Sequence, residues 1–244
     1  MKISVTGSSG RMGLAVQEAI AENPDAELAS THDVGEDLAA ALANADAVID
    51  FTLHSFTEEV VKAALASNTK LVIGTTGHSA GELAVIHEAA KTIPVVHAPN
   101  FSIGVNTLFW LTRKAAAILG NERFDIEVTE MHHRHKIDAP SGTARRLLDI
   151  LNEETSTSYE DDVAHGRVGN IGARPSKEIG MHTLRGGDVV GDHTVMFAAD
   201  GERIELTHKA SSRMTFAAGA VQAALWLQDK PAGLYDMQDV LGLK

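Results

Sequence analysis

Short apolar runs alternate with amphipathic segments along the first hundred residues. The apolar runs are rich in β-branched residues and bounded by turns, which is typical of strands, and they lie at residues 2–6, 27–31, 47–51, 70–73 and 94–97. The segments between them carry apolar residues at helical spacing, at residues 14–22, 36–43, 56–66 and 82–91. Strands and helices that alternate in this way predict an α/β domain with a parallel sheet and right-handed crossovers over residues 1–100.

After residue 100 strands and helices no longer alternate regularly. Long helices are predicted at residues 105–119 and within 139–154, and a polar, glycine-bearing loop at 155–177. Alternating runs predict strands at residues 124–131, 180–185, 193–199 and 203–209. We expect residues 101–215 to form a second, α+β domain built on a mixed sheet. A last helix is predicted at 216–228, and the segment 216–244 is expected to pack back on the first domain.

A glycine-rich turn follows the first predicted strand and opens the first helix: Gly7, Ser8, Ser9, Gly10, Arg11, Met12 and Gly13. Glycines there permit a tight turn and close approach of the backbone to a pyrophosphate, and the helix start offers free N–H groups to the phosphates. The spacing G-x-x-G-x-x-G differs from the common G-x-G-x-x-G, and a sharp turn without a ligand is the alternative. Together with the parallel sheet, the turn predicts a Rossmann-like dinucleotide-binding domain.

Polar or small residues also follow the later strands, where open α/β sheets bind ligands. Asp33 follows the second strand at the distance where an acid meets the adenosine ribose, although a solvated loop acid is the alternative. Residues 50–52 follow the third strand, and the fourth and fifth strands are followed by Gly74, Thr75, Thr76, Gly77 and by Ala98, Pro99, Asn100, Phe101. We expect the cofactor to be NADH or NADPH. No arginine lies between Leu14 and Lys62 to hold a 2′-phosphate, so NADH is at least as well suited.

The net charge, the absence of cysteine and the lengths of the apolar segments exclude several classes of function. The chain of 244 residues has a formal net charge of −12, which argues against a nucleic-acid or anionic membrane surface. No cysteine is present, so disulfides, thiol nucleophiles and Cys-ligated metals are excluded. The most apolar late segment, residues 217–227, is shorter than the roughly 18 residues of a membrane span. We expect a cytoplasmic protein that binds neither nucleic acid nor membrane.

Positive charge in this acidic chain is concentrated at residues 132–136, with the sequence HHRHK. Histidine delivers a proton near neutral pH, and lysine neutralises a carboxylate as a compact charge. A solvated surface or an adventitious zinc site is the alternative. Adjacent histidines on a strand point to opposite faces, so His132 and His133 do not easily share one ion. No metal is expected.

The residues that follow predict an anion site. Pro140, Ser141, Gly142 and Thr143 immediately precede a helical run, so their N–H groups and hydroxyls are placed to receive a carboxylate. A simple helix cap at Ser141 is the alternative. An acid beside a carboxylate site predicts an enzyme that acts on a small anionic substrate.

These motifs resemble the dihydrodipicolinate reductase (4-hydroxy-tetrahydrodipicolinate reductase) family over nearly the whole chain. The resemblance is carried by residues 7–13, 50–52, 74–77, 100–102, 130–144, 208–213 and 233–236, of which the segment 130–144 is the most specific. It implies NAD(P)H-dependent reduction of a cyclic imine dicarboxylate with loss of water, in lysine and diaminopimelate biosynthesis. It also implies a homotetramer formed through the sheet of the second domain. Val34 stands where some NADPH-using members have arginine.

The resemblance also implies residue roles. His132 is expected to donate and accept the proton, and Lys136 to be a second proton donor that contacts substrate. The substrate carboxylates would be held by His133, Ser141, Gly142 and Thr143. The cofactor would contact residues 7–12, Asp33, residues 74–77 and residues 98–101.

Two other functions are consistent with parts of the pattern. A dehydrogenase of the aspartate or homoserine type shares the first-domain features but not the HHRHK run. A non-catalytic nicotinamide-sensing protein is the second, since a cofactor domain implies no chemistry by itself.

Overall fold

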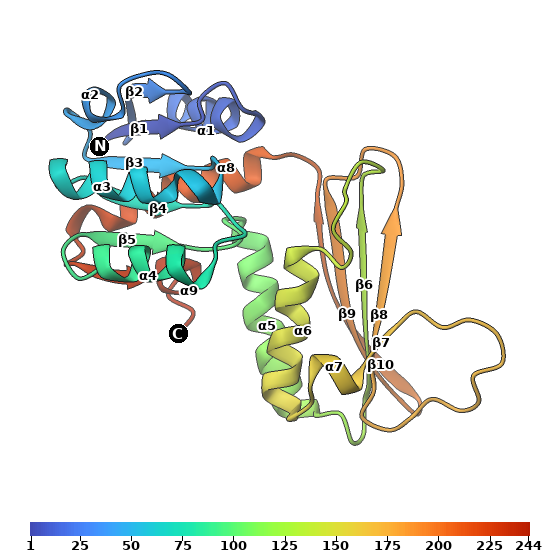
Figure 1. The fold of residues 1–244 in the computed structure, drawn as a ribbon. Helices are drawn as coiled ribbons and strands as arrows, with labels where there is room; N and C mark the ends of the chain where they lie inside the picture. Colours follow the sequence, from blue (N-terminus) through green and yellow to red (C-terminus); the bar gives the residue numbers. More distant parts are fainter. The chain divides into compact units, whose positions relative to one another are not determined.

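The computed structural model describes residues 1–244 and divides into two compact units. The first unit joins Met1–Ile103 to Arg213–Lys244, and the second comprises Gly104–Ser212. Figure 1 shows a sheet flanked by helices in the first unit and a second, separate sheet beside helices α5 and α6 in the other.

The first unit is built on six parallel strands in the order β11-β5-β4-β3-β1-β2. The strands are β1 (Lys2–Thr6), β2 (Glu27–His32), β3 (Ala47–Asp50), β4 (Lys70–Ile73), β5 (Pro94–His97) and β11 (Gly233–Tyr235). The helices are α1 (Arg11–Glu22), α2 (Leu38–Leu42), α3 (Thr57–Ser67), α4 (Ala80–Ala89), α8 (Met214–Trp226) and α9 (Met237–Val240), with 3-10 turns at His54–Phe56 and Leu227–Asp229. This confirms the predicted Rossmann-like parallel sheet. The strand order reverses at β1, so the turn after β1 lies at the switch point where such sheets bind ligands.

Each face of this sheet has its own apolar core. Val48 and Ile49 are adjacent in β3 and point to opposite faces, and both are fully buried. Ile49 packs in a cluster with residues of α1, α8 and α9, and Val48 packs with residues of α2, α3 and α4. Burial on both faces explains why the central strands β3 and β4 are continuous apolar runs in the sequence.

The C-terminal segment holds more structure than the single predicted helix. Helix α8 ends at Trp226, and the chain then adds β11 to the edge of the sheet, with Leu234 paired in parallel to Val95. Tyr235 packs edge-on against Trp226, with ring centroids 5.1 Å apart. A three-residue strand carries too little pattern to be recognised in the sequence, since its pairing with β5 is what makes it a strand.

The second unit contains a five-stranded mixed sheet in the order β10-β9-β6-β8-β7, as predicted for its class. Strands β6 (Asp125–His132), β8 (Ile179–Arg185) and β7 (Val163–His165) are parallel, whereas β9 (Gly191–Ala199) runs antiparallel to β6 and to β10 (Glu202–Ala210). Helices α5 (Ile103–Leu119) and α6 (Gly142–Thr155) pack their apolar residues against one face. The predicted loop 155–177 contains a short helix, α7 (Tyr159–Asp162), and strand β7, both too short to be recognised in the sequence.

Helices α1 and α4 start two or three residues earlier than predicted. Helix α4 begins at Ala80 because Ser79 and Glu82 form a reciprocal capping box. Helix α1 begins at Arg11 because Gly10 is still extended and ends the turn. None of the helices is both long enough and apolar enough to cross a membrane.

Helix α8 lies so close to the segment after β5 that only glycine fits at one position. A Cβ on Gly219 would lie 1.8 Å from the carbonyl oxygen of Phe101. Gly219→Ala is therefore expected to lower the free energy of unfolding by about 1–3 kcal/mol, because the helix must shift. Urea unfolding followed by tryptophan fluorescence measures this change in free energy.

The control is Gly81→Ala in α4, where the nearest atom to a new Cβ is 3.9 Å away. There we expect stabilisation of about 0.5–1 kcal/mol, since alanine favours the helix over glycine. Equal stability of Gly219→Ala and the unaltered protein would show that this close packing is not needed.

Candidate active site

The glycine turn between β1 and α1 has backbone groups that no side chain covers. Gly7 has a φ of +63°, and a Cβ on Gly13 would lie 2.2 Å from the carbonyl oxygen of Gly7. The side chain of Gln17 donates hydrogen bonds to the carbonyl oxygens of Ser8, at 2.8 Å, and Gly13, at 3.2 Å. Gly10 offers no side chain to cap α1, and no acid lies in its first turn. The first N–H groups of α1 and the side chain of Arg11 are thus available to an anion.

Asp33 joins this turn to the end of β2. Its Oδ2 accepts hydrogen bonds from the backbone N–H of Ser9, at 2.8 Å, and from the hydroxyl of Ser8, at 3.3 Å. Hydrogen bonds from Ser9, and then from the N–H of Val34, lower the pKa of Asp33 from its ordinary 3.8 to about 2. Asp33 has no cationic partner. Its ionised carboxylate is therefore a hydrogen-bond acceptor at the edge of the sheet where the strand order reverses.

A buried carboxylate, that of Asp50, connects the ends of strands β1, β3 and β4. Asp50 is fully buried and accepts hydrogen bonds from the hydroxyls of Thr6 (2.7 Å) and Thr52 (2.6 Å) at Oδ1. Its Oδ2 accepts from the hydroxyl of Thr75 at 2.7 Å. The Thr75 hydroxyl of the Gly-Thr-Thr-Gly turn therefore faces inward, and Thr76 and Gly77 are the exposed members of that turn.

The remaining predicted cofactor residues lie on the same edge. A Cβ on Gly74 would lie 2.1 Å from the ring of Phe51, and Phe51 packs edge-on against Phe101 with centroids 5.7 Å apart. Asn100 caps the turn after β5 by accepting a hydrogen bond from the N–H of Ser102 at 2.8 Å. Ala98 is buried and Pro99 is exposed. The first unit thus gathers all the predicted cofactor residues at the carboxyl ends of its strands.

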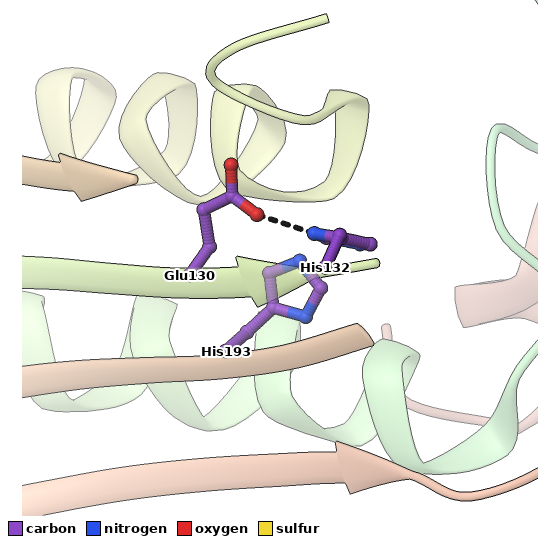
Figure 2. A group of neighbouring side chains, drawn as sticks. All are labelled: Glu130, His132 and His193. Atoms are coloured by element: carbon purple, nitrogen blue, oxygen red, sulfur yellow. Dashed lines mark hydrogen bonds and ion pairs between the residues drawn. The ribbon is translucent and has the colours of Figure 1, made fainter. Parts of the chain in front are cut away.

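In the second unit, the end of β6 carries a buried pair of Glu130 and His132 (Figure 2). They lie two residues apart on a strand and so point to the same face. The Nδ1 of His132 donates a short hydrogen bond to Oε2 of Glu130. Burial alone would raise the pKa of Glu130, but the hydrogen bonds from His132 and Arg185 lower it to about 2. The carboxylate is therefore ionised at neutral pH.

The loop after β6 closes over the other oxygen of Glu130. Its Oε1 accepts hydrogen bonds from Arg185 Nη2 at 2.9 Å and from the N–H of Ser141 at 3.2 Å. Arg185 also donates to the carbonyl oxygen of Asp138 at 2.5 Å. Lys136 lies within this loop, with its Nζ 2.9 Å from Oδ1 of Asp138.

Helix α6 begins at the end of the loop. The hydroxyl of Ser141 accepts a hydrogen bond from the N–H of Ala144 at 3.2 Å and so caps the helix. Gly142 is exposed and Thr143 is partly buried in the first turn, which has no acidic side chain. His133 is partly buried beside His135, with ring centroids 6.3 Å apart. Through Glu130, the structure brings His132 and the start of α6 together.

Three residues of this cluster, Glu130, Arg185 and His193, were not among the site residues predicted from the sequence. His193 of β9 lies directly opposite Glu130 in the antiparallel register, and its ring packs edge-on against His132, with centroids 5.1 Å apart. Burial, and then the nearby His132, lower the pKa of His193 to about 3, so its imidazole is neutral. Neither His193 nor Arg185 lies near the HHRHK run in the chain, and only the pairing of β9 and β8 with β6 places them there. Glu130 could have been found from its two-residue spacing to His132.

The ligand atoms of Glu130, His132 and His193 lie within 4.8 Å of one another, which is close enough for a metal ion. Arg185 already neutralises the same carboxylate, and the Nδ1–H of His132 occupies its second oxygen. A cation would have to displace the proton and lie beside a guanidinium, so this arrangement favours a hydrogen-bonded cluster.

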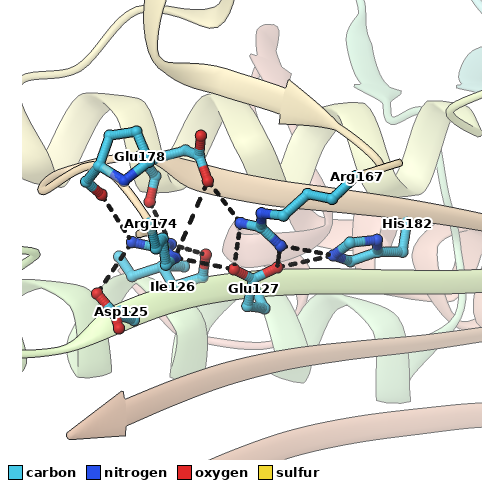
Figure 3. A network of polar contacts seen from close by, with 8 residues as sticks. Asp125, Ile126, Glu127, Arg167, Arg174, Glu178 and His182 are labelled. Carbon is cyan, nitrogen blue, oxygen red and sulfur yellow. Dashed lines mark hydrogen bonds and ion pairs between the residues drawn. The ribbon is translucent and has the colours of Figure 1, made fainter. Parts of the chain in front are cut away.

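A second charged cluster, shown in Figure 3, lies on the opposite side of β6 from Glu130. Glu127 pairs with Arg167, at 2.7 Å, and with Arg174, at 3.0 Å, and it accepts a hydrogen bond from His182 at 2.7 Å. A Cβ on Gly180 would lie 1.8 Å from Glu127, so glycine makes room for this carboxylate. The cluster attaches the loop between β7 and β8 to the sheet.

Comparison with known proteins gives one family along the chain. Residues 1–101 match the family model described as "Dihydrodipicolinate reductase, N-terminus", and residues 104–241 match "Dihydrodipicolinate reductase, C-terminus". The chain is 64% identical over 243 residues to a 4-hydroxy-tetrahydrodipicolinate reductase of Akkermansia muciniphila, covering 100% of this chain and 98% of the relative. It is 46% identical to the enzyme of the same name from Magnetococcus marinus, covering 100% and 99%.

Among solved structures, the dipicolinate-bound dihydrodipicolinate reductase from Paenisporosarcina sp. TG-14 has the same fold. The TM-score is 0.78 at 23% identity, and the match covers 98% of each chain.

The cluster around Glu127 makes the free energy of unfolding depend on pH. Burial would raise the pKa of Glu127, but Arg167, His182 and Arg174 lower it from 4.5 to about 2. Because the folded-state pKa is the lower one, this stabilisation is complete above the unfolded value and is lost as the pH falls towards about 2. Glu127→Gln should therefore lower the free energy of unfolding near neutral pH and flatten its fall between about pH 4.5 and 2.

Urea unfolding at a series of pH values measures this difference. Glu122→Gln is the control, because the Glu122 side chain is 79% exposed and 3.5 Å from Lys177. If the curves of Glu127→Gln and the unaltered protein ran parallel over this range, the ion pairs would not stabilise the fold.

Proposed function

The chain belongs to the dihydrodipicolinate reductase family, and we propose that it reduces 4-hydroxy-tetrahydrodipicolinate to tetrahydrodipicolinate with NADH or NADPH. As a member of this family it is an NAD(P)H-dependent oxidoreductase of lysine and diaminopimelate biosynthesis. In the net reaction the ring gains a hydride and a proton and loses one water. The first unit is assigned to the cofactor and the second to the substrate.

The first unit fits a dinucleotide. Its glycine turn leaves no room for side chains at Gly7 and Gly13, and the uncapped start of α1 faces the phosphate position of such folds. Asp33 would accept hydrogen bonds from the adenosine ribose. The turns at residues 74–77 and 98–101 would hold the nicotinamide end. Bound reduced nicotinamide supplies the hydride.

The second unit would hold a dianionic ring at the start of α6. The N–H groups of Gly142 and Thr143, the Ser141 and Thr143 hydroxyls and the ring of His133 would receive the two carboxylates. Lys136 would add a positive charge and serve as a second proton donor, after exchanging its contact with Asp138 for the substrate.

His132 would deliver the proton. Hydride addition to a system conjugated to an imine leaves electron density on the ring, and an imidazolium quenches that density by protonation. The observation that carries this proposal is the link from His132 through Glu130 to the N–H of Ser141, which joins an acid to a carboxylate site.

His132→Ala is expected to lower kcat by about 10²- to 10⁴-fold, since a positioned general acid contributes that much. A coupled assay that makes the substrate enzymatically and follows the loss of reduced-nicotinamide absorbance measures it. NADH affinity, measured by fluorescence titration, should be unchanged.

His135→Ala removes an exposed imidazole from the same run and should leave kcat within about twofold. An unchanged kcat in His132→Ala would refute the proton role of His132.

We propose a preference for NADH over NADPH. Asp33 is ionised and has no cation beside it, so a 2′-phosphate would meet a negative charge. Val34 is 99% exposed, so arginine is tolerated there. Val34→Arg should raise kcat/KM for NADPH by about tenfold relative to NADH, as a charged hydrogen bond to phosphate would.

Val34→Ala is the matched control and should leave the NADH-to-NADPH ratio unaltered. A wild-type kcat/KM that is higher for NADPH would contradict the preference itself.

The two competing functions are separated by the same assay. A nicotinamide-sensing protein would bind NADH without oxidising it when the imine substrate is supplied. A dehydrogenase of the aspartate or homoserine type would oxidise or reduce its own substrate and leave the cyclic imine unreacted. The acid and the carboxylate site in one unit favour the reductase.

We also propose that the protein is a cytoplasmic homotetramer assembled through the sheet of the second unit. Helices α5 and α6 cover one face of this sheet, whereas β10 presents several exposed residues. The mass of the purified protein in solution tests whether it is a tetramer.

A further inference from the structure

We propose that Glu130 is a positioning residue that fixes the tautomer and charge of His132. The inference rests on the proposed proton role of His132 and deepens it. Both oxygens of the carboxylate already accept hydrogen bonds from donors of the protein. The carboxylate acts through the imidazole on one oxygen and through the loop before α6 on the other.

The hydrogen bond determines which nitrogen is reactive. An ionised carboxylate only accepts, so Nδ1 of His132 must carry the proton that is donated to Glu130. Nε2 is then the nitrogen that gives and takes the mobile proton, and it has no hydrogen-bond partner in the chain. A Cβ on Gly191 would lie 2.9 Å from this Nε2, so glycine keeps the reactive nitrogen accessible.

The surrounding charges favour a single mobile proton. His193, which packs edge-on against His132, is neutral because burial lowers its pKa to about 3. Glu130 is the one buried anion facing the imidazole, and it stabilises the imidazolium. The other titratable or charged groups around this cluster are Lys136, Asp138, Arg185, Asp192 and His208.

Arg185 prevents Glu130 from taking the proton itself. Its guanidinium lies 2.9 Å from Oε1 and keeps the carboxylate ionised while the imidazole is protonated on both nitrogens. The same oxygen receives the N–H of Ser141 at 3.2 Å, so the acid and the carboxylate site are held in one arrangement.

Glu130→Gln tests the inference, because it keeps the shape and removes the charge. His132 must be protonated to act as a donor, so kcat falls as the pH rises and the proton is lost. Without the carboxylate this loss comes earlier. The high-pH limb of kcat should move down by about one pH unit or more, and kcat at pH 8 should fall by about 10- to 100-fold.

Two variants control for the loss of a buried carboxylate. Glu127→Gln makes the same change on the same strand, beside another histidine and two arginines, and should leave the limb in place. Glu130→Asp keeps the charge and should return the limb towards its original position, even where kcat is reduced.

NMR of ¹³Cε1-labelled histidine gives a readout that does not depend on turnover. The His132 signal is assigned by its absence in His132→Asn, and its titration should move to lower pH in Glu130→Gln. If that titration does not move, Glu130 does not set the charge of His132 and the inference fails. If the titration moves while the kcat limb stays, the proton role of His132 fails instead.

The metal alternative is tested with zinc alone. Turnover that is lost on dialysis against a chelator and restored by stoichiometric zinc would overturn the positioning role. Turnover that is indifferent to both treatments supports it.

Discussion

A carboxylate buried at the end of a strand must be surrounded by donors, because an unpaired charge in the interior costs several kcal/mol. Each unit of this protein contains one such group. Asp50, at the end of β3, is held by the hydroxyls of Thr6, Thr52 and Thr75. Glu130, near the end of β6, is held by an imidazole, a guanidinium and a backbone N–H. In both cases the carboxylate joins segments that are distant in the chain, and turns that hold predicted site residues are attached to it.

The donors differ in a way that suits the two halves of the reaction. The hydroxyls around Asp50 carry no charge, so they tie the turns after β1, β3 and β4 into a rigid edge without titrating. Around Glu130, by contrast, Arg185 is cationic and His132 is the proposed proton donor, and only the N–H of Ser141 is an uncharged donor. An edge held by uncharged donors suits the binding of a cofactor, and a cluster with charged donors suits the proposed transfer of a proton.

Much of the fold and part of the candidate site could be predicted from local sequence patterns. Burial on both faces gave β3 and β4 continuous apolar runs, and the glycine turn marked the switch point. The segment 130–144 predicted that an acid and a carboxylate site belong to one part of the chain. Strands β7 and β11 could not be read, because three residues carry no period and depend on their neighbours for pairing.

The sequence by itself determined the parallel sheet of the first unit and the α+β class of the second, because these follow from periodicity, and residue type together with the family resemblance supplied the candidate site residues. Only the tertiary structure decided what surrounds His132. The antiparallel register of β6 and β9 places His193 opposite Glu130, and the parallel pairing of β6 with β8 places Arg185 beside it. Such contacts depend on strand order and register between residues 55 and 63 positions apart in the chain, and no local pattern encodes a contact over that separation.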